Sequence, residues 1–81
     1  MASFAVSFKG VLFKLHLERL AAAGIALQSS EPAMQIGSIK MGEPINTVLV
    51  DADSEENAIA TVKAKLTPDD VNFSNWDASP S

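Results

Sequence analysis

A sharp change of pattern in the second half of the chain constrains the fold most. Residues 45–50 are rich in β-branched side chains, which is typical of a strand. Residues 51–56 are four acids with one alanine and one serine, and Asp53 and Glu56 have the spacing of a capping box. Apolar residues then recur at helical spacing, at Ala58, Ile59, Val62 and Leu66. The pattern predicts a strand followed by a helix that ends before Pro68.

The first residues predict another strand and another helix. Apolar and small residues alternate in 3–8, which places Phe4, Val6 and Phe8 on one side of a half-buried strand. Residues 11–23 end in three alanines and predict a helix, on which apolar side chains share one face at Phe13, Leu17 and Leu20. Gly24 is at the position of a left-handed C-cap. Alternation within 13–17 leaves open a second strand in place of this helix.

The middle of the chain predicts an antiparallel hairpin. An extended segment begins at Ile25, and alternation resumes in 33–41. Gly37 and Ser38 shift the phase of that alternation, which suggests a β-bulge. Residues 42–44 supply a turn, so 33–41 is expected to pair with 45–50.

The last residues predict a short strand and a tail. Alternation in 71–76 indicates a final strand, whereas 77–81 is polar and expected to be a flexible tail. Trp76 is interpreted as a lid over the core, because a small domain can rarely leave so much apolar area unused.

The predicted order is strand, helix, strand, strand, helix, strand. This order predicts an α+β fold, a ferredoxin-like βαββαβ sandwich with an antiparallel sheet and two helices on one face, formed by a single domain over residues 1–76. A chain of 81 residues buries only roughly 60–65% of its unfolded surface. Since one face of the sheet is left uncovered, we expect a homo-oligomer, most simply a homodimer.

Composition excludes several kinds of chemistry. The chain has no Cys and one His, so thiolate zinc sites, disulfides, Cys nucleophiles and His clusters are ruled out, and we expect no metal and no cofactor. The net charge is −4, and the four cations of residues 1–42 are widely spaced, which disfavours nucleic-acid binding. No long uncharged apolar stretch exists, so we expect no membrane association and a cytoplasmic location.

Two features invite a catalytic or metal interpretation and do not sustain it. The acids of 51–56 resemble the start of a calcium loop, but Glu56 and Val62 occupy the positions that require glycine and glutamate. His16 lies inside the first predicted helix between charged neighbours, which favours a structural role. The sequence therefore predicts no catalytic residues.

Three segments resemble the ACT domain family. They are Gly10-Val11-Leu12 before the first helix, residues 20–25 at its end, and residues 48–53 before the second helix. The resemblance covers residues 3–66 and implies a small regulatory module of ferredoxin-like fold that pairs with itself and binds amino acids or related ligands. It also implies that Gly10, Val11 and Leu12 line the ligand edge through backbone groups.

Two functions follow from this reading. The first is a non-enzymatic module, a homodimer that binds a small ligand or regulates a partner. The alternative is a small acidic interaction factor, an inhibitor or adaptor, whose charged second half docks on a basic protein. The residues expected to make that contact are Glu55, Glu56, Asp69, Asp70 and Trp76.

Overall fold

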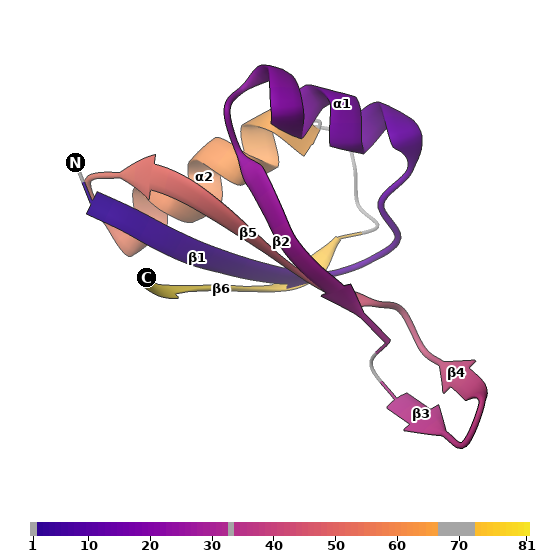
Figure 1. The fold of residues 1–81 in the computed structure, drawn as a ribbon. Helices are drawn as coiled ribbons and strands as arrows, with labels where there is room; N and C mark the ends of the chain where they lie inside the picture. Colours follow the sequence, from indigo (N-terminus) through magenta and orange to yellow (C-terminus); the bar gives the residue numbers. More distant parts are fainter. Residues whose placement is uncertain (1, 33, 67–72) are drawn as a thin grey trace.

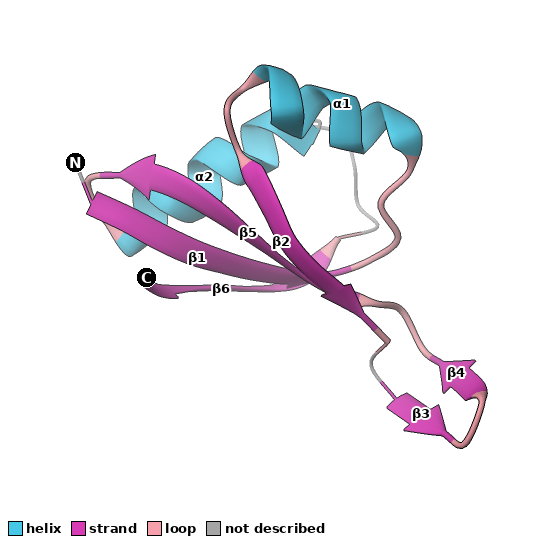
Figure 2. Ribbon diagram, in the orientation of Figure 1, coloured by secondary structure: helices cyan, strands magenta, loops and turns pink. Residues whose placement is uncertain are grey.

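A four-stranded antiparallel sheet carries both helices on one face (Figures 1 and 2). The computed structural model describes residues 2–32, 34–66 and 73–81. In chain order the elements are β1 (Ala2–Lys9), α1 (Lys14–Ala22), β2 (Ala26–Glu31), β3 (Met34–Ile36), β4 (Ile39–Met41), β5 (Ile45–Ala52), α2 (Glu55–Leu66) and β6 (Ser74–Pro80). The strand order in the main sheet is β2-β5-β1-β6, and β3 and β4 form a separate two-stranded sheet. The predicted α+β class is confirmed.

The core lies between the sheet and the two helices. β1 and β5 are paired along their whole length, from Ala2 opposite Ala52 to Lys9 opposite Ile45. Side chains alternate between the faces of a strand, so every second residue of each central strand points to the helices. The buried apolar residues are Phe4, Val6, Phe8, Leu20, Ile25, Val48, Val50, Ala52, Ala58, Val62, Leu66, Phe73 and Ala78. The expected inward face of the first strand is confirmed.

α1 begins and ends with specific hydrogen bonds. At its start, the Phe13 N–H donates to Nδ1 of His16 at 3.1 Å. At its end, Gly24 has φ +76°, its N–H bonds Ala21 O at 3.0 Å, and the Ile25 N–H bonds Leu20 O at 2.9 Å. These two bonds are those of a Schellman motif, so the predicted glycine C-cap is confirmed.

The helical interpretation is correct for Lys14–Ala22 of the predicted 11–23, whereas residues 11–13 precede the helix, and the alternative second strand is wrong. The face that α1 buries was not the one expected. His16 and Leu20 are buried, whereas Phe13 is 63% exposed and Leu17 is also exposed. His16 takes the inward position because Phe73, from the far end of the chain, meets its ring edge-on at 5.2 Å. The spacing of apolar residues within the helix gives no information about this contact with Phe73.

The N-cap of α2 is Ser54 and not Asp53. The Ser54 carbonyl accepts the Ala58 N–H at 2.9 Å, and its Oγ accepts the Asn57 N–H at 3.2 Å. The expected capping box of Asp53 and Glu56 is therefore wrong by one residue. The apolar face is as predicted, since Ala58, Val62 and Leu66 are all buried.

Residues 34–41 form a separate hairpin that projects from the body, and we call it the arm (Figure 1). Ile36 lies opposite Ile39, so Gly37 and Ser38 are a two-residue turn and not a bulge. Gly37 has φ +60°, and glycine at the first central position is what a type II′ turn requires. The expected pairing of 33–41 with 45–50 is wrong, because β5 pairs with β1 and β2. Among the described elements, β3 and β4 contact only each other.

The C-terminal strand begins later than the sequence predicted, at Ser74 and not before Phe73, and it also ends later. Asp77 to Pro80, expected to be a tail, belong to β6 and pair with β1, with Phe4 opposite Pro80. Ser81 continues the contact by donating its N–H to the carbonyl of Ser3 at 3.1 Å. One extra residue of β6 lies between the pairs Ser7–Asp77 and Lys9–Ser74, and Asn75 takes φ +56° at this bulge. The predicted start of the last strand at 71 and 72 lies outside the described residues.

Candidate functional site

The turn between β1 and α1 holds the three residues that the ACT resemblance suggests for a ligand edge. The Gly10 N–H donates to the carbonyl of Pro44 at 2.9 Å, and the Gly10 carbonyl accepts Nδ2 of Asn46 at 2.8 Å. Leu12 packs against the core, and Val11 is exposed. The Gly10 N–H is therefore engaged within the chain, and a ligand could accept a hydrogen bond from it only by displacing the Pro44 carbonyl.

Asn46 is the polar centre of this region, and sequence reasoning did not single it out. Its side chain is fully buried, and its Oδ1 accepts a hydrogen bond from Oγ of Ser30 at 2.6 Å. One amide therefore connects β2, β5 and the turn at Gly10. The signal was present in the sequence, because Asn46 precedes Val48 and Val50 on the inward side of a strand, where a polar residue needs internal partners.

An aromatic cluster closes the same side of the core. Trp76 stacks on Phe8 with centroids 4.6 Å apart, and Phe73 meets Phe8 edge-on at 5.3 Å. Nζ of Lys63 lies 5.2 Å from the centroid of the Trp76 ring. The indole is half-buried by these contacts, so Trp76 acts as a lid over the core. His16, with its Nδ1 at the start of α1 and its ring on Phe73, has a structural role.

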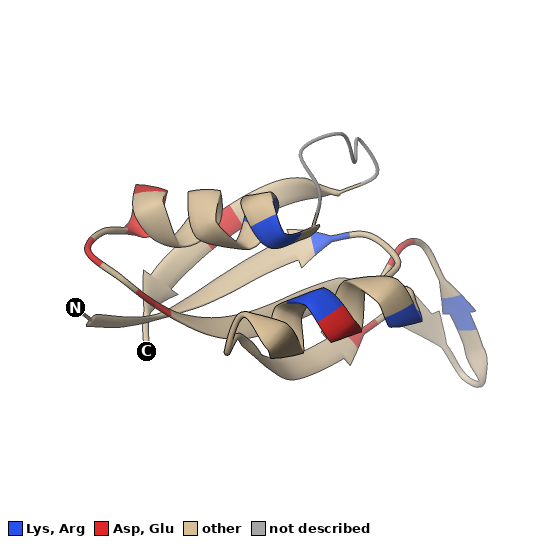
Figure 3. Ribbon diagram, turned by 90° about the horizontal axis from the view of Figure 1, so that it is seen from above, with Lys and Arg blue, Asp and Glu red and all other residues tan. Residues whose placement is uncertain are grey.

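Exposed carboxylates gather where β5 ends and α2 begins (Figure 3). We call this region the acidic end, and its residues are Asp51, Asp53, Glu55 and Glu56. Four negative charges close together on a small surface suit a basic protein segment or a small cation-bearing ligand.

The structure brings together only part of the predicted docking set. Glu55 and Glu56 lie at the start of α2, whereas Trp76 packs near Lys63 in the last turn of that helix. Asp69 and Asp70 lie outside the described residues. Trp76 and the acidic end are therefore separate features.

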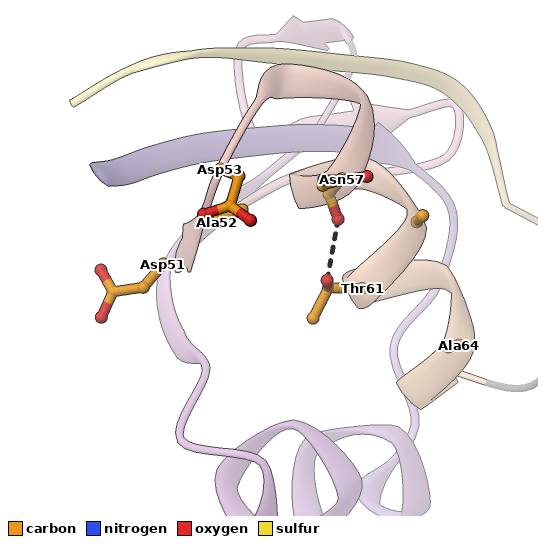
Figure 4. Close-up of a pocket in the computed structure, with 7 residues that line it drawn as sticks. Asp51, Ala52, Asp53, Asn57, Thr61 and Ala64 are labelled. Atoms are coloured by element: carbon orange, nitrogen blue, oxygen red, sulfur yellow. Dashed lines mark hydrogen bonds between the residues drawn. The ribbon is translucent and has the colours of Figure 1, made fainter. Parts of the chain in front are cut away.

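A shallow cleft runs along α2 beside the acidic end (Figure 4). It has a volume of about 410 Å³, and its polar walls come from Asp51, Asp53, Asn57 and Thr61. Oγ1 of Thr61 donates to the Asn57 backbone carbonyl at 2.8 Å, so this hydroxyl is already engaged in the helix. The remaining lining residues are alanines, so the cleft offers a ligand little apolar contact area.

The arm presents an apolar face that nothing in the described chain covers. Successive side chains of β3 and β4 point to opposite faces of the hairpin. Four apolar side chains therefore share one face, and Gln35 and Lys40 lie on the other. The four apolar residues, each 48–62% exposed, are Met34, Ile36, Ile39 and Met41. The exposed area is on the order of 300–500 Å², which is the size of the largest apolar patch on a typical monomeric protein.

A second apolar surface lies where the arm joins the body. The hydrogen bond between Gly10 and Pro44 holds the β1–α1 turn against the start of β5. The exposed residues of this turn, Val11 and Phe13, are 45% and 63% exposed, and we call them the arm base. The alternation of residues 33–41 and the Gly-Ser pair could have predicted the arm, but no local pattern predicts that it stays uncovered.

Comparison with known proteins adds no relative. No family model, no curated protein and no solved structure matches the chain. Within residues 2–32, 34–66 and 73–81, no group of three His, Asp or Glu side chains could hold a metal ion. Neither described helix is long and apolar enough to cross a membrane.

Proposed function

We propose that the protein is a non-enzymatic interaction module that binds other protein chains through its arm. The strongest support is the exposed apolar face of the arm, which consists of Met34, Ile36, Ile39 and Met41. Four large apolar side chains in contact with water lower the solubility of a small protein unless a partner covers them. The described residues offer no competing catalytic constellation, since His16 is committed to the start of α1.

The architecture that presents the arm is, in this proposal, a ferredoxin-like sandwich with one insertion. The strand order β2-β5-β1-β6 supports this assignment, because the first and third core strands lie in the middle of the sheet. The arm then interrupts the connection between the second and third core strands, β2 and β5. In the same proposal, the resemblance to ACT domains concerns this shared framework, and binding is carried by the inserted arm.

The test compares two lysine substitutions on neighbouring residues of the arm. Ile36→Lys places a charge on the apolar face, and Gln35→Lys places the same charge on the polar face. Wild type and both variants are immobilised as full chains, exposed to an extract of the protein's own cells, and the retained proteins are identified by mass spectrometry. We expect the same retained set for wild type and Gln35→Lys and a depleted set for Ile36→Lys. Identical sets for all three chains would contradict the proposal.

Small-ligand binding is the second candidate function, and the cleft beside α2 favours it. The carboxylates of Asp51 and Asp53 suit a ligand with a protonated amine, such as an amino acid. Binding to the native state would raise the melting temperature in a ligand panel, and Asp53→Asn would remove the rise. A melting temperature that no amine ligand changes would count against this candidate and leave the arm proposal intact.

A further inference from the structure

We infer that the partner of the arm is a second copy of this chain, in a twofold dimer where each arm packs on the arm base of the other copy. This inference rests on the proposed function and names the partner. Each surface is an unpartnered apolar patch in one copy, and a reciprocal exchange covers both patches at once. A twofold arrangement makes the two contacts identical, which is the commonest way for a small chain to associate.

The exposed area supports the exchange over a simpler stacking of the two arms. Arms stacked face to face would bury on the order of 600–1,000 Å² in total, below the roughly 1,200 Å² at which specific stable interfaces begin. Adding Val11 and Phe13 of both copies raises the total to roughly 1,000–1,400 Å², which reaches the lower end of the range of specific interfaces. The available apolar surface therefore matches what a stable dimer needs only when the arm base is included.

The distribution of charge also favours contact at this end of the molecule. The arm and the start of α1 lie at one end of the long axis, and the acidic end lies at the other (Figures 1 and 3). The longest extent of the chain is 41 Å, several times the Debye length of about 8 Å at physiological salt. Near the arm, Lys9 and Lys40 balance Glu31 and Glu43. Two chains of net charge −4 can therefore meet at the arm end with the carboxylates of their acidic ends far apart.

The uncovered face of the main sheet is a weaker candidate for self-association. On the central strands this face has two large apolar residues, Ile45 and Leu49. Its other residues there are small, polar or charged: Ser3, Ala5, Ser7, Lys9, Thr47 and Asp51. An antiparallel sheet commonly leaves such a face in water. The homodimer expected from the sequence is thus proposed here at the arm, and not across the sheet.

The experiment is a charge-swap complementation measured by analytical ultracentrifugation of the full chain. Ile36→Lys alters the arm, Phe13→Glu alters the arm base, and Gln35→Lys is the matched control on the polar face of the arm. We expect wild type and Gln35→Lys to be dimers, and each of the other two variants alone to dimerise roughly 30-fold more weakly or worse. An equimolar mixture of Ile36→Lys and Phe13→Glu should recover a dimer, because one contact is intact and the new charges are opposite in the other.

Three outcomes would overturn the inference. Wild type that remains monomeric at about 100 µM, far above the dissociation constant of a standard-size interface, excludes the dimer. Loss of the dimer in Ile36→Lys with no effect of Phe13→Glu assigns the contact to stacked arms. Absence of recovery in the mixture excludes the reciprocal exchange.

Two controls keep these outcomes interpretable. Circular dichroism melting shows that each variant is folded, and Val11→Glu replaces Phe13→Glu if the latter fails to fold. A monomer that still retains a different protein through Ile36 leaves the proposed function standing while this inference fails.

Discussion

At the scale of single residues, Asn46 shows how a polar side chain can be buried near the start of a central strand. It has no exposed surface, and its amide serves Gly10 through Nδ2 and Ser30 through Oδ1. Burial of an amide is unfavourable unless its hydrogen bonds are made inside the protein, so the two partners decide whether this residue stabilises the fold. The bond to Gly10 also holds the arm base in place, which connects one side chain to the proposed interaction surface.

Replacement of Asn46 by alanine should lower the free energy of unfolding by about 2–3 kcal/mol, because it strands the Gly10 carbonyl in the interior and leaves a small cavity. Ser30→Ala removes the hydroxyl that donates to the buried Oδ1 of Asn46 but opens no cavity in the core, and it should cost about 1–2 kcal/mol. Chemical denaturation of both variants measures the difference. Equal effects of the two substitutions would show that the Gly10 bond contributes nothing.

At the scale of elements, the start of α2 shows how two good caps compete. Asp53 and Ser54 both precede the helix, and both side chains can accept from a backbone N–H. The outcome is set by β5, which continues to Ala52 because Ala52 pairs with Ala2. Ser54 is then placed to receive the Asn57 N–H, and Asp53 is left at the cleft.

Ser54→Ala should therefore destabilise the protein by about 1 kcal/mol, whereas Asp53→Ala should change stability by less than about 0.5 kcal/mol. Thermal denaturation of the two variants under one buffer condition makes the comparison. A larger loss for Asp53→Ala would restore the capping box that the sequence suggested.

The same scale shows what sequence could and could not predict. β1, α1, β2, β5 and α2 follow from alternation, helical spacing and the cap at Gly24, because these signals lie within one element. The buried face of α1 depends on Phe73, and the pairing of β5 depends on β1, so both required contacts across the chain. The candidate site was missed for the same reason. The arm is visible as a pattern, but its exposure is a property of the whole fold.

At the scale of the whole molecule, the two chain ends are joined through the sheet. β6 covers one edge of β1, with Ala78 buried opposite Val6 and Pro80 opposite Phe4. In a domain of this size the total stability is a few kcal/mol, on the order of 5. A strand contributed by residues that look like a polar tail is thus a substantial part of what keeps the chain folded.

Removal of residues 77–81 tests this directly. The truncated chain loses the buried Ala78 and most of the β1–β6 ladder, so we expect a loss of about 2 kcal/mol or more and a melting temperature lower by roughly 10 °C. The bared edge of β1 should also promote aggregation, which light scattering detects. Deletion of Ser81 alone, which removes only its bonds to Ser3, is the matched control and should cost about 1 kcal/mol or less. A full-length melting temperature in the longer truncation would mean that 77–81 behaves as the free tail that its composition suggests, and that the core is closed by Phe73 and Trp76 alone.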